Sequence, residues 1–304
     1  LTGFFPSTYG LYLTTLLMST GFHYFETVNQ SLTLQWIDKE KTAHFMGRLL
    51  SAKSVGSLLA YGSVWILMDY AGWSYQSTYA LFGFFALIMA LLMYFAFSSF
   101  EQPHNQSKKL ILRKDYWLFY ALTFFSGARR QIFVVFAGFL MVEKFNYSVA
   151  DISALFLINY VFNWIFAARI GKLIGKVGER NILIFEYVGL IILFIAYGLV
   201  ETGMAAAVLY VVDHLFFALA IAIKTYFQKI ARPEDIAATA GVSFSINHIA
   251  AVVIPAILGA VWMVDSSLVF YVGAGFAACS LMLSILIPKT PEQGHEWRYK
   301  KRMA

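Results

Sequence analysis

The sequence has little charge of either sign and almost no cysteine. Charged residues make up 13% of the 304 residues, roughly half the share of a soluble domain. The single cysteine, Cys279, excludes an intramolecular disulfide framework and a cysteine-based metal site. The sequence also lacks H-E-x-x-H, G-x-S-x-G and Walker motifs. We therefore expect no enzyme, no cofactor and no metal centre.

Long hydrophobic runs are what the sequence has instead. Hydrophobic residues make up 60% of the chain, and nine stretches are long enough to cross ~30 Å of hydrocarbon at ~1.5 Å per residue. The stretches are residues 9–36, 46–68, 77–98, 116–141, 150–170, 181–200, 205–228, 237–263 and 267–287. Polar residues interrupt the first of them. The pattern predicts an all-α polytopic membrane protein with nine transmembrane helices.

Basic residues gather on alternate loops. The basic set comprises residues 38–48, 101–114, 171–180, 228–235 and the tail 288–304, whereas the loops between them contain Lys144 alone. The positive-inside rule places the basic set and the C-terminus in the cytoplasm and the N-terminus outside. The same rule accounts for the net charge of +6, so we expect a lipid bilayer and no nucleic acid as partner. We expect an integral protein of a plasma membrane of the bacterial inner-membrane type.

The longest and most polar connection divides the chain. It predicts a partial N-terminal bundle of three helices (1–100), a central cytoplasmic loop (101–114), a C-terminal six-helix bundle (115–288) and a cytoplasmic tail (289–304). The tail run "HEWRYKKR" is typical of a membrane-surface anchor or a topology signal.

One basic loop carries a recognisable motif. "GKLIGKVGER" (171–180) resembles the loop motif G-x-L-x-D-R-x-G-R-R of the major facilitator superfamily. The matching residues are Gly171, Leu173, Lys176, Gly178 and Arg180. Gly175 occupies the acidic position and Glu179 replaces a basic residue. We expect the glycines to permit a tight turn between packed helices.

The resemblance to the family extends from the motif to the order of loops and spans along the chain. The central loop, the six spans after it and the cytoplasmic C-terminus follow the family layout, so the nine spans resemble helices 4–12 of twelve. Helices 1–3 are then missing from a chain that begins at Leu1 without a signal peptide. The family implies a secondary transporter of small molecules with two bundles and a site near the membrane midplane.

Four basic residues lie within predicted spans: Lys53, Arg129, Arg130 and Lys224. Intramembrane charges mark functional sites by default. Arg129 and Arg130 are roughly 100° apart around a helix, so we expect one to face a cavity and the other a neighbouring helix. Arginine binds carboxylate or phosphate bidentately, which favours an anionic substrate. The alternative is an internal ion-pair network without a substrate role.

The first span carries a polar stripe along one helical face. It consists of Thr15, Ser19, His23, Glu26, Gln30 and Thr33, spaced three or four residues apart. His23 and Glu26 are candidates for a proton-coupling pair, or for a hydrogen-bonded pair that packs helices. Lys53 either holds a substrate anion or neutralises Glu26.

Further polar residues lie in the later spans. Asp213 and Lys224 share a helical face but are roughly 16 Å apart, so each needs another partner, and Asp213 is the third proton-coupling candidate. Asn159 and Asn247 either contact ligand or join helices. We expect Glu186, near the cytoplasmic end of its span, to pair with a basic residue of a loop.

These residues favour a proton-coupled symporter of a small organic anion that works by alternating access. Two alternatives remain: a carrier that exports an amphipathic compound through an aromatic interior, and a non-transporting relative that assembles with or senses other molecules.

Overall fold

The structure, a computed structural model, describes residues 1–5, 7–97, 104–107 and 109–300. Parts of the predicted central loop (101–103 and 108) and of the tail (301–304) lie outside the described residues. Within them the regular structure is helical, apart from one isolated bridge between Glu292 and His295. The all-α expectation is therefore confirmed for this part of the chain.

The described residues form nine long helical stretches after a short turn, η1 (Thr2–Phe4). They are α1 (Thr8–Trp36); α2 (Lys39–Trp65) with the π-helical η2 (Ile66–Tyr70); α3 (Tyr75–Ala96); η3 (Lys114–Tyr116), α4 (Trp117–Gln131), the π-helical η4 (Ile132–Ala137) and α5 (Gly138–Phe145); α6 (Val149–Val177); α7 (Glu179–Leu199); α8 (Gly203–Phe216), the 3-10 segment η5 (Phe217–Ala220) and α9 (Ile221–Ile230); η6 (Pro233–Asp235) and α10 (Ile236–Trp262); and α11 (Ser266–Ile285). Eight of these stretches are long and apolar enough to cross a membrane. The exception, α1, has 29 residues, and its polar stripe lowers its hydropathy.

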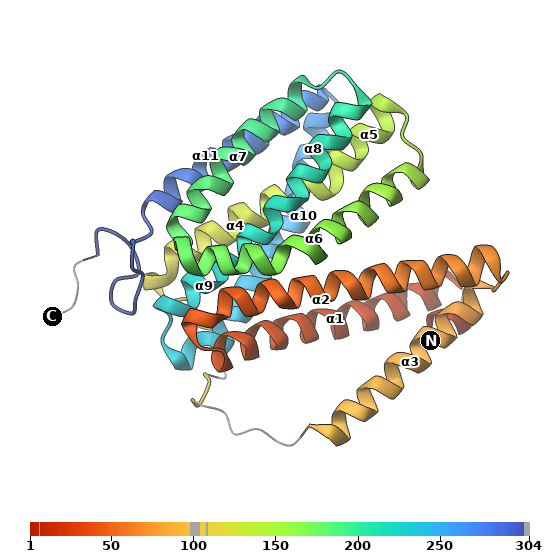
Figure 1. The fold of residues 1–304 in the computed structure, drawn as a ribbon, viewed down its shortest axis with the longest axis horizontal. Helices are drawn as coiled ribbons and strands as arrows, with labels where there is room; N and C mark the ends of the chain where they lie inside the picture. The colour runs from red at the N-terminus through yellow and green to blue at the C-terminus, as the bar shows by residue number, and fades with distance from the viewer. Residues whose placement is uncertain (6, 98–103, 108, 301–304) are drawn as a thin grey trace.

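The helices separate into two parts (Figure 1). Helices α4 to α11 make up six of the nine stretches and form a bundle, which we call the six-helix part; α1 to α3 are the other part. Helices α1 and α2 lie along the side of the six-helix part, and α3 diverges from it and from α1 and α2. Helix α2 packs against α6, and α1 against α10, whereas α3 makes its main described contacts with η1 and η2. The turns between α1 and α2, α6 and α7, and α9 and η6 meet at one end, together with the start of η3 and the tail. We call it the basic end.

Helix starts at the opposite end are capped by side chains. Hydroxyl or carboxylate oxygens accept hydrogen bonds from backbone N–H groups of the first turn, which otherwise lack partners. The caps are Ser7 of α1, Ser74 of α3, Ser148 of α6, Thr202 of α8 and Asp265 of α11. Ser148 and Asp151 form a full capping box. These capping residues determine where each of the five helices begins.

Two predicted loops are largely helical. Helix α2 begins at Lys39, so most of 38–48 is helix, and α6 continues to Val177, so most of 171–180 is helix as well. The prediction was wrong here because polar residues at the end of a spanning helix look like loop in a hydropathy pattern. Only Gly178, with φ of 87°, separates α6 from α7, and this left-handed conformation suits glycine.

Small residues bring α2 and α6 together. Ala43 and Gly47 of α2 face Ala167 and Gly171 of α6, and a Cβ added at either glycine would collide with the backbone of the other helix. This is the small-xxx-small pattern of close helix packing. Gly171, predicted to form a turn, is instead a packing residue of this contact.

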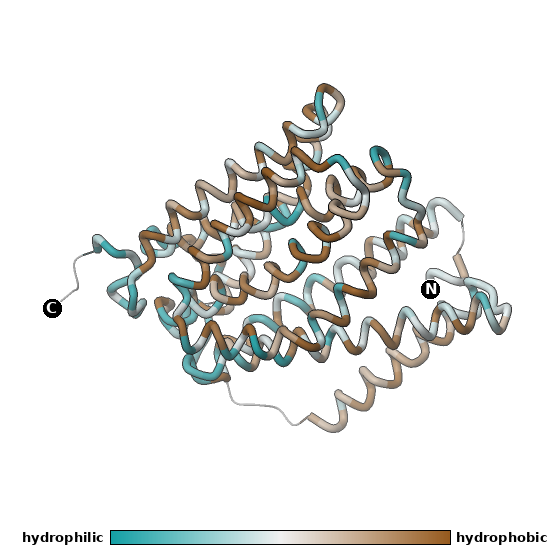
Figure 2. Tube along the Cα trace, turned by 45° about the horizontal axis from the view of Figure 1, so that its top comes forward, coloured by the Kyte–Doolittle hydropathy of each residue, from teal (hydrophilic) through white to brown (hydrophobic). Residues whose placement is uncertain are grey.

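The core lies in the six-helix part. Helix α7 has ten buried residues, among them Tyr187, Phe194 and Tyr197, whereas only Thr78 is buried in α3. Tyr197 stacks on Phe270 of α11 with ring centroids 5.0 Å apart. Figure 2 shows apolar residues along the helices and hydrophilic ones mainly at the turns. Charged groups buried inside the six-helix part are therefore exceptions to this pattern.

Candidate transport site

A salt bridge joins α1 to α2. Lys53 Nζ lies 2.7 Å from Glu26 Oε1, and the two side chains are 42% and 31% exposed. Of the two roles expected for Lys53, the structure shows the pairing with Glu26. Because both groups remain accessible, the pair is still open to water or to a ligand.

Two cations of the six-helix part join this pair. Arg130 of α4 is exposed and interacts electrostatically with Glu26. Half-buried Lys224 of α9 interacts with Glu26, Lys53 and Arg130. Three cations and one carboxylate leave a formal charge of +2. We call these four residues the inter-bundle cluster, because they come from both parts of the molecule.

A second charged group lies inside the six-helix part. Arg129 Nη2 lies 2.6 Å from Glu186 Oε1, and the two residues are 1% and 0% exposed. Asp213 of α8, also 0% exposed, interacts electrostatically with both. Arg129, Glu186 and Asp213 form what we call the buried cluster, with a formal charge of −1 if all three are ionised.

The two adjacent arginines therefore point in different directions. Exposed Arg130 belongs to the inter-bundle cluster, whereas Arg129 reaches a neighbouring helix, as the ~100° between them requires. Both were predicted as substrate residues, but Arg129 is enclosed in the bundle and does not reach the inter-bundle surface.

The partner expected for Glu186 was wrong. It pairs with Arg129 rather than with a loop cation. Glu186 lies two turns into α7, and the nearby basic residue Lys229 is already bound 2.6 Å from Glu179, at the start of that helix. The sequence could not reveal this pair, since it depends on how α4 and α7 pack.

His23 does not bond to Glu26. Its ring packs against His248 and Phe244 of α10, with centroids 4.4 and 5.1 Å away. The two candidates for a proton-coupling pair thus have different partners, because Glu26 is bound to Lys53. The histidines form part of the contact between α1 and α10.

The asparagines lie between helices. Asn159 is buried, and neither amide atom of its side chain has a hydrogen-bond partner among the described residues. Asn163, one turn further on, lies 2.9 Å from His214 Nε2. Asn247 donates to the Ser243 carbonyl at 3.2 Å and faces Gly127 of α4, an arrangement that fits helix packing.

The residues of the loop motif lie at the basic end. Leu173 and Lys176 are exposed on α6, and half-buried Arg180 is the second residue of α7. Glu179, where the family motif has a basic residue, is buried and pairs with Lys229 of α9. The motif therefore links the α6–α7 turn to the end of α9.

Hydrogen bonds tie the two parts together at the basic end. Gln228 of α9 donates to the carbonyls of Leu34 and Ile37, both at 2.8 Å, and Lys39 Nζ donates to the Lys229 carbonyl at 3.2 Å. These bonds hold the α1–α2 turn against α9. They close the basic end between the two parts.

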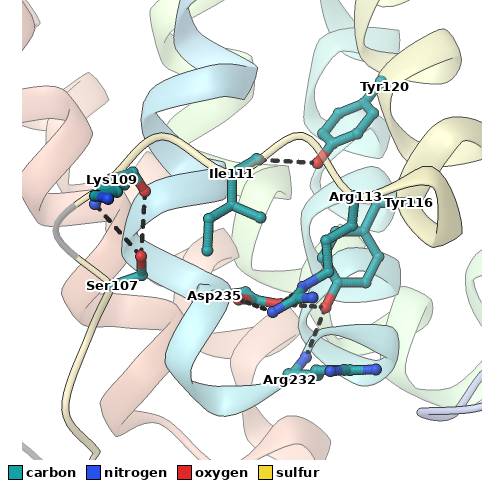
Figure 3. Close-up of polar contacts among 8 residues, drawn as sticks. All are labelled: Ser107, Lys109, Ile111, Arg113, Tyr116, Tyr120, Arg232 and Asp235. Atoms are coloured by element: carbon teal, nitrogen blue, oxygen red, sulfur yellow. Dashed lines mark hydrogen bonds and ion pairs between the residues drawn. The ribbon is translucent and has the colours of Figure 1, made fainter.

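A buried carboxylate at this end was not among the residues predicted from the sequence (Figure 3). Buried Asp235 accepts from the Arg113 guanidinium at two nitrogens and from Tyr116 Oη at 2.9 Å, while Tyr116 Oη accepts from Arg232 N at 3.0 Å. The network anchors the described end of the central loop to the start of α10. Its sequence signal is weak, because Pro233 to Asp235 resemble an ordinary helix start.

The tail folds back onto the six-helix part. Lys300 bonds to Asp115 and Glu296, each at 2.7 Å, and Trp297 packs edge-on against Trp117. Desolvation lowers the pKa of Lys300, but the hydrogen bonds to Asp115 and Glu296 outweigh it and raise the pKa overall. The described part of the predicted surface anchor thus packs on the protein itself.

The described residues form spanning helices in two parts with charged residues between them, an arrangement that fits a polytopic membrane protein. The sequence profile of the Major Facilitator Superfamily matches residues 1–255, so the chain belongs to this family of secondary transporters. It is an integral membrane protein that carries a small molecule across the bilayer. No curated protein matches the chain.

Proposed function

We propose that the protein is a proton-coupled symporter of small organic anions that works by alternating access. The observation that carries the proposal is the inter-bundle cluster. Glu26 is bonded to Lys53 and interacts electrostatically with Arg130 and Lys224, so the charged residues come from both parts of the molecule. An anionic substrate would satisfy the excess charge.

The cations suit carboxylate binding in different ways. Arg130 offers a planar, bidentate donor, and Lys53 and Lys224 offer ammonium groups. Lys53 is held by Glu26, so an entering carboxylate would compete with Glu26 for it. Binding therefore changes contacts between α1, α2 and the six-helix part, which is what alternating access requires.

The test is uptake by proteoliposomes that contain the purified chain. The probes are radiolabelled lactate, succinate and citrate, with an inward proton gradient. We expect at least one probe to accumulate and unlabelled carboxylates to compete. Competition by an amphipathic cation instead, with no uptake of any carboxylate, would contradict the proposal and support export of amphipathic compounds.

Arg130→Gln provides the residue-level test. Loss of charge-assisted hydrogen bonds of ~1.5–3 kcal/mol corresponds to a roughly tenfold to hundredfold loss of affinity. Lys144→Gln is the matched control, because Lys144 lies outside the cluster and donates to the Val200 carbonyl at 2.7 Å. Equal uptake in both variants would rule out a role for Arg130.

We also propose that the basic end and the C-terminus face the cytoplasm of a bacterial-type plasma membrane. The distribution of basic residues supports this orientation. In a Cys279→Ser background, exposed Lys109→Cys and Glu201→Cys mark the two ends. In intact cells a membrane-impermeant maleimide should label the variant at position 201 and not the one at 109. The reverse pattern would invert the topology.

A further inference from the structure

Two carboxylates share one cation inside the six-helix part. Arg129, Glu186 and Asp213 are each at most 1% exposed. Ionising all three would leave an uncompensated negative charge, which costs several kcal/mol in a protein interior. One added proton makes the buried cluster neutral.

The hydrogen bonds distinguish the two carboxylates as sites for that proton. Glu186 Oε1 accepts from Arg129 at 2.6 Å, so Glu186 is the ionised carboxylate. Neither oxygen of Asp213 has a hydrogen-bond partner in the described residues. A buried, unpartnered carboxylate is far more costly than a neutral carboxylic acid, so the geometry favours Asp213 as the protonated residue.

Among the described residues, the neighbouring titratable groups do not supply a second cation. Tyr187 adjoins Glu186, and Tyr197 and Tyr210 interact electrostatically with Asp213. These phenols are neutral. His214 follows Asp213, but its Nε2 lies 2.9 Å from the Asn163 amide, and its electrostatic partner is Arg130. Arg129 is thus the cation that both carboxylates face.

The backbone beside the cluster departs from α-helix on both sides. The π segment η4 begins three residues after Arg129, and the 3-10 segment η5 begins four residues after Asp213. Phe133 of η4 packs on Phe217 of η5 with centroids 4.9 Å apart, and the Arg129 guanidinium lies 5.7 Å from the Phe217 ring centroid. Such segments occur often at functional sites and allow local changes of register.

We propose that the buried cluster is the binding site of the coupling proton and that Arg129 moves between the two carboxylates. This rests on the proposed function in one respect, that a proton is the coupling ion. When Asp213 releases its proton and becomes a carboxylate, the Arg129 guanidinium leaves Glu186 and pairs with Asp213. Glu186 then takes up one proton and becomes the neutral acid. The guanidinium keeps its proton throughout, so one proton enters and one leaves.

Infrared difference spectroscopy tests the cluster without a substrate. Purified full-length protein is titrated between acidic and alkaline pH while the carbonyl stretch of protonated carboxylic acid is recorded in H₂O and D₂O. We expect one such band to persist at pH values where exposed carboxyl groups are ionised, and to shift on deuteration. Asp213→Asn and Glu186→Gln should each remove or shift it.

Glu179→Gln is the matched control. Glu179 is buried at the start of the same helix, but it has its own cation, Lys229. The band should be unchanged in this variant. Absence of the band in the wild type, or a band unaffected by both cluster substitutions, would overturn the proposal even if a variant proved poorly folded.

Transport separates failure of this site from failure of the proposed function. In proteoliposomes, Asp213→Asn should lower proton-driven accumulation of lactate, succinate or citrate at least tenfold. If the wild type transports none of these probes, the proposed function fails, and the infrared band still reports on the cluster. If the wild type accumulates a probe and Asp213→Asn does so equally well, the proton site is elsewhere.

Discussion

The inter-bundle cluster and the buried cluster contain the same kinds of residue in opposite settings. The first is accessible and has a formal charge of +2, whereas the second is enclosed and would have a formal charge of −1 if all three of its groups were ionised. Arg129 and Arg130 are neighbours in the chain and belong to different clusters. Burial, rather than residue type, therefore distinguishes the two clusters.

The largest effect on stability is expected from a substitution that disrupts the buried cluster. Arg129→Ala leaves the buried, ionised Glu186 without its cation and should cost about 3–5 kcal/mol of stability. Arg130→Ala, one residue on, removes an exposed charge and should cost less than about 1 kcal/mol. Thermal unfolding of the two purified variants measures the difference. Equal melting temperatures would mean that the two arginines do not differ in environment.

The second-largest effect is expected from a substitution that disturbs the inter-bundle cluster and leaves the buried cluster intact. Gly47→Leu places a side chain against the backbone of α6 and should cost about 1–3 kcal/mol through overpacking. It should move Lys53 away from Lys224 and lower uptake of the carboxylate probes, while the infrared band of Asp213 remains. Gly56→Leu on the same helix is the control, because nothing lies within 4 Å of a Cβ there. Loss of uptake in both variants would assign the effect to α2 in general.

Lys224→Gln should raise the KM for whichever of lactate, succinate and citrate the wild type accumulates by about tenfold, or ~1.4 kcal/mol. Glutamine removes the positive charge but keeps most of the side-chain stem. Because arginine keeps the charge, Lys224→Arg should retain more affinity for the anion than Lys224→Gln. Initial uptake rates over a range of probe concentrations give the KM. An unchanged KM in Lys224→Gln would remove this residue from the anion site.

The smallest effect concerns Glu26. Its salt bridge with Lys53 is partly exposed, and such pairs contribute about 0–1 kcal/mol. Glu26→Gln should therefore leave the melting temperature nearly unchanged, whereas Glu186→Gln should lower it clearly. If Glu26→Gln destabilised the protein as much as Glu186→Gln, the contrast between the clusters would be lost.

The sequence predicts the helices well because lipid leaves few alternatives. A spanning segment must satisfy its backbone internally and be apolar for about 20 residues, so the nine stretches were recognisable. Helix ends were less certain. Polar residues such as those of 38–48 continue α2 beyond the apolar run, and only the structure shows that they remain helical.

Pairings between helices were predictable only in part. Glu26 was a foreseeable partner for Lys53, because both lie in adjacent spans and few other carboxylates were available. The partners of Glu186 and His23 depend on which helices meet: α7 brings Glu186 to Arg129, and α10 brings His248 to His23. The exposure that separates Arg129 from Arg130 likewise requires the packed bundle.

Simultaneous measurement of anion uptake and proton movement tests the central claim most directly. Proteoliposomes containing the wild-type chain and a trapped pH-sensitive dye are given lactate, succinate or citrate at equal pH on both sides. We predict that the lumen acidifies as one of these anions enters, and that the Asp213→Asn variant shows no acidification. Anion entry without acidification in the wild type would contradict proton coupling, and no entry of any of the three would contradict an anion site between the bundles.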